Sequence, residues 1–172
     1  MPILRFEETI RRGLYLPEEE IKPVICVFDP IAVHAPILDY ALAEIRKEVN
    51  VFWQASFSPV WIEAGGIDEW IDGDLIAVKR PILLISELQV VSGSYLFGLK
   101  MLKSLRRAAG LRNLPLVVIS DADCLLEVYD KAEKELKELR VSQFFNWQDL
   151  EKESEEQKRL FDFVSQIIGF RM

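Results

Sequence analysis

The sequence has few of the residues that mark common catalytic and metal-binding patterns. Among 172 residues there are two cysteines, Cys26 and Cys124, and one histidine, His34. The cysteines show no CxxC and no cysteine–histidine spacing, so we expect reduced structural thiols in a cytoplasmic protein. His34 has no serine or cysteine nucleophile pattern beside it, which favours a capping or surface role over catalysis.

Long apolar runs and an excess of positive charge are absent too. No run approaches the roughly 18–20 apolar residues of a membrane span. The first residues carry charges from Arg5 onward and lack the apolar core of a signal peptide. The formal net charge of −7 disfavours general binding to nucleic acid. We therefore expect a cytoplasmic protein with no membrane and no nucleic-acid partner.

Short apolar runs that close on small or polar residues are what the sequence does contain. Each is followed by a segment with helical periodicity, the alternation typical of buried parallel strands joined by helices. Together with a fifth strand at 50–55, they predict a three-layer, doubly wound α/β fold. Its five-stranded parallel sheet would have the flavodoxin-like order 2-1-3-4-5. The four runs are Val24–Phe28, Ile82–Ile85, Leu116–Ile119 and Val141–Phe145.

The predicted helices cover residues 35–49, 95–109, 122–139 and 148–169, with a short one near 67–71. Residues 1–22 are expected to form an N-terminal extension and polar linker, and residues 23–172 one domain. The segment 58–78 has no clear period. Trp53, Trp61 and Trp70 cluster in or near this segment, and an exposed pair among them would indicate a partner-binding surface.

The carboxyl ends of parallel strands line the working crevice of such a sheet, so the residues there are the first candidates for chemistry. At these positions residues 23–168 resemble the receiver domain of two-component response regulators. The stretch 27–30, Val-Phe-Asp-Pro, is similar to the acidic start of a receiver. Residues 81–87 look like its phosphoacceptor strand, 98–106 like the Gly-Leu-rich helix after it, and 114–120 like the strand with a terminal Ser or Thr. Phe145-Asn146-Trp147 stands where receivers have Lys-Pro.

The resemblance implies a degenerate phosphoacceptor pocket. In a receiver an aspartate attacks a phosphoryl group, acidic residues hold Mg²⁺, and a lysine and a hydroxyl clamp the phosphoryl oxygens. Here the acceptor position falls on Ser86 or Glu87, and neither is aspartate. Of the acidic pair only Asp29 remains, and Asn146 stands in place of the lysine. The hydroxyl is retained as Ser120, but Asp121 follows it and adds a negative charge. These pocket residues are Asp29, Ser86, Glu87, Ser120, Asp121 and Asn146.

The resemblance thus predicts a stand-alone pseudo-receiver that signals through protein contacts, is not an enzyme and holds no cofactor, with Mg²⁺ doubtful. Glu87 could imitate a permanently charged acceptor, although a plain polar residue at a strand end is the simpler interpretation. In receivers the face of the fourth helix, fifth strand and fifth helix makes dimers or binds partners. We therefore expect a protein partner or homodimer contact at residues 130–139 and 148–158.

A divalent-metal enzyme is the alternative interpretation of the same strand ends. Asp121-Ala122-Asp123 forms a DxD pattern, and carboxylates so spaced can bind Mg²⁺ or Mn²⁺. With Asp29 and Glu87 they would make a four-carboxylate site. Asp121 or Asp123 also suits the N-cap of the helix that follows.

Charge is unevenly distributed along the chain. The segment 59–75 has five acidic residues and no basic one, whereas the segment 94–113 has five basic residues and no acidic one. Two solvated faces that offset each other would explain this pattern. A basic docking face near residues 95–109, suited to an acidic partner, is the second interpretation.

Overall fold

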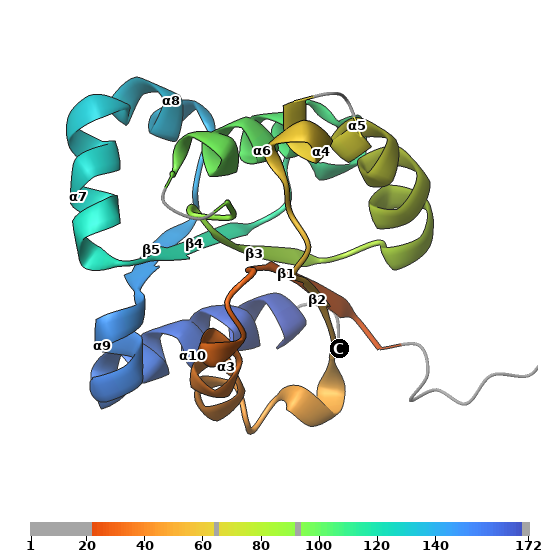
Figure 1. Cartoon of the computed structure of the whole chain (residues 1–172). Helices are drawn as coiled ribbons and strands as arrows, with labels where there is room; N and C mark the ends of the chain where they lie inside the picture. Colours follow the sequence, from red (N-terminus) through yellow and green to blue (C-terminus); the bar gives the residue numbers. More distant parts are fainter. Residues whose placement is uncertain (1–21, 64–65, 92–93, 170–172) are drawn as a thin grey trace, which may run out of the picture.

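The computed structural model describes residues 22–63, 66–91 and 94–169 (Figure 1). The expected extension at 1–22 therefore lies, except for residue 22, outside the described residues. The chain forms one five-stranded sheet in the order β2-β1-β3-β4-β5, and every neighbouring pair is parallel. This confirms the predicted fold class and strand order. The strands are β1 (Val24–Phe28), β2 (Asn50–Gln54), β3 (Leu83–Glu87), β4 (Leu116–Ser120) and β5 (Gln143–Asn146).

Helices cover both faces of the sheet, as Figure 1 shows. On one face lie α3 (Ala35–Ala41), α9 (Trp147–Lys152) and α10 (Ser154–Gly169). On the other lie α4 (Pro59–Glu63), α5 (Gly66–Trp70), α6 (Leu96–Arg107), α7 (Ala122–Lys131) and α8 (Glu133–Glu138). Shorter turns are η2 (Ala32–His34), η3 (Arg46–Glu48) and η5 (Ala109–Leu111), and η4 (Ile71–Lys79) is a π-helix. No helix in these ranges combines the length and the apolar composition that crossing a membrane requires.

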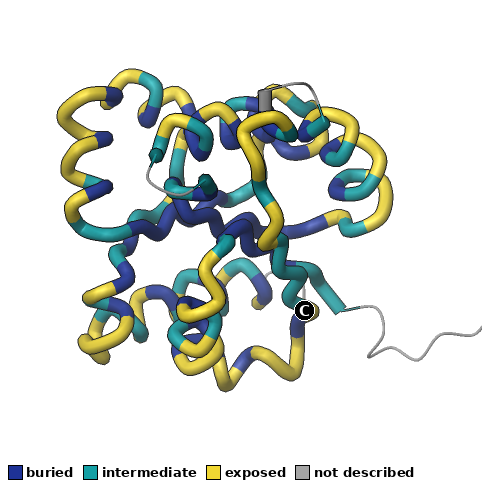
Figure 2. Tube along the Cα trace, in the orientation of Figure 1, coloured by how far each residue is buried: buried dark blue, intermediate teal, exposed yellow. Residues whose placement is uncertain are grey.

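The sheet is the buried centre of the molecule, as the dark tube in Figure 2 shows. All residues of β3 and β4 are buried. Because successive side chains of a strand point to opposite faces, each strand contributes to two cores. Cys26 and Phe28 pack with the core on the α6 side, while Ile25 and Val27 pack with the core on the α3 and α10 side.

Three of the predicted long helices are interrupted. The helix expected over 35–49 ends at Ala41, and the chain continues in tight turns that bury Leu42, Ile45 and Val49 on the same side. The helix expected over 122–139 breaks at Ala132, whose backbone (φ −141°, ψ 35°) lies outside the helical region. The helix expected over 148–169 breaks at Glu153, whose backbone (φ −107°, ψ 117°) is extended, and so divides into α9 and α10.

The segment 58–78 is more helical than predicted. It contains α4, α5 and η4, and the π-helix ends on the left-handed backbone of Arg80 (φ 49°). Trp61 and Trp70 are half-buried, with ring centres 5.6 Å apart, and Trp70 packs edge-on against Phe28. They belong to the margin of the core and do not form an exposed pair.

Strand β5 forms one edge of the sheet, and Arg159 of α10 covers part of it. The Nη2 atom of Arg159 donates to the backbone oxygen of Phe144 at 2.8 Å. Its Nη1 atom donates to the side chain of Gln143 at 2.7 Å, and the guanidinium lies 3.8 Å from the centre of the Phe145 ring.

Candidate functional site

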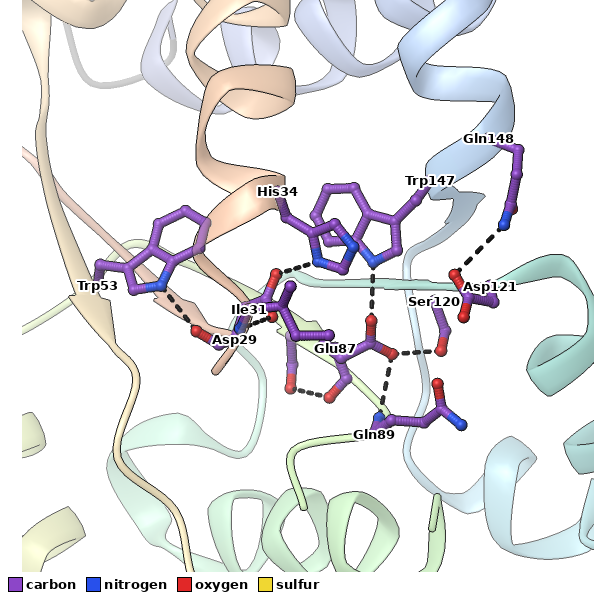
Figure 3. A network of polar contacts seen from close by, with 11 residues as sticks. Asp29, Ile31, His34, Trp53, Glu87, Gln89, Ser120, Asp121, Trp147 and Gln148 are labelled. Carbon is purple, nitrogen blue, oxygen red and sulfur yellow. Dashed lines mark hydrogen bonds and ion pairs between the residues drawn. The ribbon is translucent and has the colours of Figure 1, made fainter. Parts of the chain in front are cut away.

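Three neighbouring strand ends bring Asp29, Glu87 and Ser120 together (Figure 3). Asp29 follows β1, Glu87 ends β3 and Ser120 ends β4, and these three strands are adjacent in the sheet. All three side chains are buried. Polar groups so enclosed are stable only when they are hydrogen-bonded, which directs attention to their partners.

Both carboxylate oxygens of Glu87 have donors. The Trp147 indole Nε1 donates to Oε1 at 2.7 Å. Oε2 accepts from the backbone N–H of Gln89 at 3.0 Å and from the hydroxyl of Ser120. Burial raises the pKa of Glu87, and these three hydrogen bonds oppose the rise because they favour the ionised form.

Asp29 is enclosed in the same way. Its Oδ1 accepts from the backbone N–H of Ile31 at 2.8 Å, and its Oδ2 lies 2.6 Å from Nδ1 of His34. Its backbone oxygen accepts from the indole of Trp53 at 2.7 Å.

His34 links the two carboxylates through an aromatic stack. Its ring lies parallel to that of Trp147, with centres 3.9 Å apart and an interplanar angle of 16°. His34 is buried, and although it occupies the N-cap position of α3 its side chain makes no capping hydrogen bond. The expected capping or surface role is therefore wrong, because Asp29 and Trp147 hold this imidazole inside the pocket.

Of the other predicted pocket residues, Ser86 and Asn146 face different partners. The hydroxyl of Ser86 donates to the backbone oxygen of Glu87 at 3.0 Å, so it is Glu87 that presents its side chain to Asp29 and Ser120. The Asn146 side chain caps α9: its Oδ1 accepts from the N–H of Asp149 at 2.8 Å, and its Nδ2 donates to the Asp149 carboxylate at 2.9 Å.

Asp121 lies at the rim of the pocket, where Gln148 donates to its Oδ1 at 3.3 Å. It occupies the N-cap position of α7, yet its side chain makes no capping hydrogen bond. Asp123 is exposed in the first turn of α7.

The potential metal ligands gather differently from the sequence prediction. Within the described ranges, the group whose ligand atoms lie within 4.8 Å of one another is Asp29, His34 and Glu87. Asp121 and Asp123 are outside this group, so the predicted four-carboxylate site is not assembled. A mixed set of oxygen and nitrogen ligands can hold a divalent ion. Here, however, both carboxylates already accept hydrogen bonds and Nδ1 of His34 lies 2.6 Å from Oδ2 of Asp29, so an ion would have to compete with these contacts.

His34 and Trp147 are the site residues that the sequence interpretation missed. Trp147 directly follows β5, so the rule that places chemistry at strand ends covers its position. An indole N–H at such a position does not stand out in a sequence as a polar group, whereas a lysine does. His34 follows β1 by a few residues, so the same rule includes its position among the candidates for the site.

No protein-family model matches the sequence, and no curated protein matches it. Solved structures do. The phosphorylated cyanobacterial phytochrome response regulator RcpA is 16% identical, with a TM-score of 0.55 over 85% of this chain and 91% of that one. The Mn²⁺-bound response regulator Rcp1 is 14% identical, with a TM-score of 0.55 over 85% and 94%. A response regulator receiver domain from Rhodospirillum rubrum is 13% identical, with a TM-score of 0.55 over 83% and 93%. The chain therefore has the fold of response-regulator receiver domains.

Proposed function

We propose that this domain is a receiver-like signalling module that acts through protein contacts and does not transfer phosphoryl groups. One observation carries the proposal: the Glu87 carboxylate, at the end of β3, is buried with both oxygens engaged by Trp147, Gln89 and Ser120. An acceptor needs a carboxylate oxygen that the phosphorus can approach in line. In this pocket both oxygens face donors of the chain itself.

The described residues also lack the cationic part of a phosphoryl site. Phosphoryl transfer depends on positive groups that stabilise the charge of the transferred group. No lysine or arginine pairs with Asp29 or Glu87 in the part of the chain that the structure describes. Asn146, at the position of the receiver lysine, is committed to capping α9.

The contact between Ser120 and Glu87 supports a fixed signalling state. In receivers the corresponding hydroxyl clamps a phosphoryl oxygen, whereas here it donates to a glutamate oxygen. Glutamate is one methylene longer than aspartate, so its carboxylate reaches further from the strand. We infer that Glu87 takes the place of a charged acceptor and holds Ser120 inward permanently.

A partner or a second copy is expected to bind at the face of α7, α8 and β5. A groove there is lined by Tyr129, Leu136, Val141 and Phe144, among others. Tyr129 is 53% exposed, and Leu126 on the same helix is 70% exposed. Aromatic and aliphatic side chains of this kind are typical anchors of protein interfaces.

Incubation with acetyl phosphate and Mg²⁺, followed by intact-mass measurement, tests the proposal. We expect no phosphoryl adduct on the protein. We also expect none on Glu87→Asp, because Asn146 still supplies no cation. A receiver known to accept phosphate from acetyl phosphate serves as the positive control. A stable adduct of one phosphoryl group on the unchanged protein contradicts the proposal.

A divalent-metal enzyme remains the second candidate because Asp29, His34 and Glu87 lie within ligand reach of one another. Titration with Mg²⁺, Mn²⁺ or Zn²⁺ while the melting temperature is recorded decides between them. A site filled at a hundred times its Kd adds about 2.7 kcal/mol, which is roughly 5–10 °C for a domain of this size. We expect a shift below about 1 °C, since the ligand atoms already have partners. A large shift that His34→Gln abolishes would favour the enzyme.

A further inference from the structure

A basic groove lies at the end of the sheet opposite the pocket. It has a volume of about 620 Å³ and forms where α6 ends and where α8 leads into β5. Five cationic side chains and one carboxylate line it, in a chain whose formal net charge is −7. The charged lining residues are Lys103, Arg106, Arg107, Arg112, Arg140 and Glu138.

Arg106 forms the floor of the basic groove. It is 9% exposed, and its guanidinium donates only to backbone oxygens, at distances of 2.8 to 3.2 Å. The backbone oxygens stabilise the charge of the buried guanidinium through their dipoles. Because no carboxylate pairs with Arg106 in the described ranges, its positive charge is not neutralised by a negative one. Burial and the nearby Arg140 cation lower the pKa of Arg106, which reflects this excess of positive charge. The accepting oxygens belong to Leu111, Arg112, Leu114, Leu139 and Arg140.

The rim of the groove is also held in place. Arg140 has a left-handed backbone (φ 53°), and its Nη2 donates to the backbone oxygen of Arg112 at 2.8 Å. Lys103 and Arg107 are four residues apart on α6 and therefore share one face of that helix. Neither of them, nor Arg112, forms an ion pair within the described residues, and the one carboxylate of the lining, Glu138, is exposed.

We propose that the basic groove binds an acidic segment of a partner protein, through carboxylates spaced two residues apart in an extended chain. Side chains at i and i+2 of an extended chain leave the backbone roughly 6.6 Å apart, which is close to the Cβ spacing of about 5–6 Å between residues at i and i+4 of a helix. Guanidinium groups bind carboxylates through paired hydrogen bonds, which suits Arg107, Arg112 and Arg140.

The size and the charge of the molecule favour a short acidic segment over other anions. A groove of about 620 Å³ is much larger than a single inorganic ion. The negative charge on the rest of the molecule repels a long polyanion such as nucleic acid, whereas a short segment contacts the groove alone.

Fluorescence anisotropy with a labelled peptide of alternating glutamate and serine, about ten residues long, tests this inference. Titrations are run in about 0.15 M salt so that weak long-range attraction is screened. Binding is compared for the unchanged protein, for Lys103→Glu/Arg107→Glu, and for the matched control Lys47→Glu/Lys152→Glu. Both control lysines are exposed, and the net charge changes equally in the two variants.

We expect the groove variant to lose about tenfold or more in affinity and the control to lose less than about twofold. Far-UV circular dichroism and thermal melting verify that both variants are folded. Equal losses in the two variants, or no binding by the unchanged protein, would overturn the inference. Tighter binding of an oligonucleotide of equal length than of the peptide would also overturn it, in favour of a nucleic-acid groove. Complete competition by inorganic phosphate would overturn it in favour of an anion site.

Discussion

At the scale of single residues, Glu87 makes the stability of this protein depend on pH. Burial raises the pKa of its carboxyl group in the folded state above its ordinary value. The folded state therefore binds the proton more tightly than the unfolded chain does. As a result, the contribution of Glu87 to stability is greatest below the ordinary pKa and decreases as pH rises through the folded value.

The variant Glu87→Gln has no charge to bury, so it should not show this decrease. We expect its free energy of unfolding, minus that of the unchanged protein, to increase as pH rises above the ordinary pKa of a glutamate. Urea denaturation at a series of pH values measures the difference. Glu44→Gln at an exposed position is the control, and its difference should be nearly independent of pH. Parallel curves for all three proteins would contradict this prediction.

The sequence predicted the positions of the carboxyl and hydroxyl side chains of the pocket. It did not predict the aromatic residues that pack around and hydrogen-bond to them. Asp29, Glu87 and Ser120 follow from the rule that parallel strands end at one edge of the sheet. The choice between Ser86 and Glu87 needed the structure, because a shift of one residue along a strand reverses the face. His34 and Trp147 act through ring stacking and an indole N–H, and neither leaves a spacing pattern in the sequence.

At the scale of elements, the packing of α6 against the loop after β3 depends on Gly98. A Cβ atom at Gly98 would lie 1.9 Å from the backbone oxygen of Leu88 and 2.7 Å from its carbonyl carbon. Both are backbone atoms, so α6 or the loop would have to move. The close approach therefore requires glycine within α6.

We expect Gly98→Ala to lower the free energy of unfolding by about 3 kcal/mol, as in severe overpacking. Gly73→Ala is the matched control, since a Cβ there meets nothing within 4 Å. It should be neutral or stabilising by about 0.5–1 kcal/mol because alanine restricts the unfolded chain. Urea denaturation of both variants measures the contrast, and equal stabilities would show that α6 can shift freely.

Strands were easier to predict than helix boundaries. An apolar run between polar breakers fixes a buried strand within a residue or two, as Leu116–Ser120 shows. The apolar stripe of 122–139 continues across the break at Ala132, because α7 and α8 both face the same core. Hydrophobic periodicity indicates which face of a segment is buried. It does not show where one helix ends and the next begins, if both bury the same face.

At the scale of the whole molecule, the two cysteines report on global unfolding. Both thiols are buried, and burial raises the pKa of Cys26 to about 12 and also raises that of Cys124. Only the thiolate reacts, so the folded protein should be nearly inert to a thiol reagent such as DTNB at about pH 8.

In increasing urea we expect both thiols to become reactive together, with the same midpoint as the loss of far-UV circular dichroism. A single core sheet shared by all layers is the physical reason for one cooperative transition. Rapid labelling of one cysteine without denaturant would contradict this expectation and would locate a locally opening region. Cys26→Ser and Cys124→Ser, labelled singly, would identify which thiol is responsible.

The sheet order was predictable as a whole because right-handed crossovers leave few topologies for five alternating units. The surfaces were less predictable. Of the basic residues in 94–113, Arg106 is buried and bonded to backbone oxygens, so a run of charges in the sequence does not by itself define a docking face. Only the fold places Arg140 beside the α6 cations.

Arg159 has a further consequence for how copies of this protein behave at high concentration. The unpaired backbone N–H and C=O groups of an edge strand can pair with a strand of another chain and extend the sheet, which is a common route to aggregates. At β5 the guanidinium occupies the backbone oxygen of Phe144 and covers the ring of Phe145, so an incoming strand would first have to displace it. One side chain of the last helix thus protects this edge of the sheet from fibre-like growth.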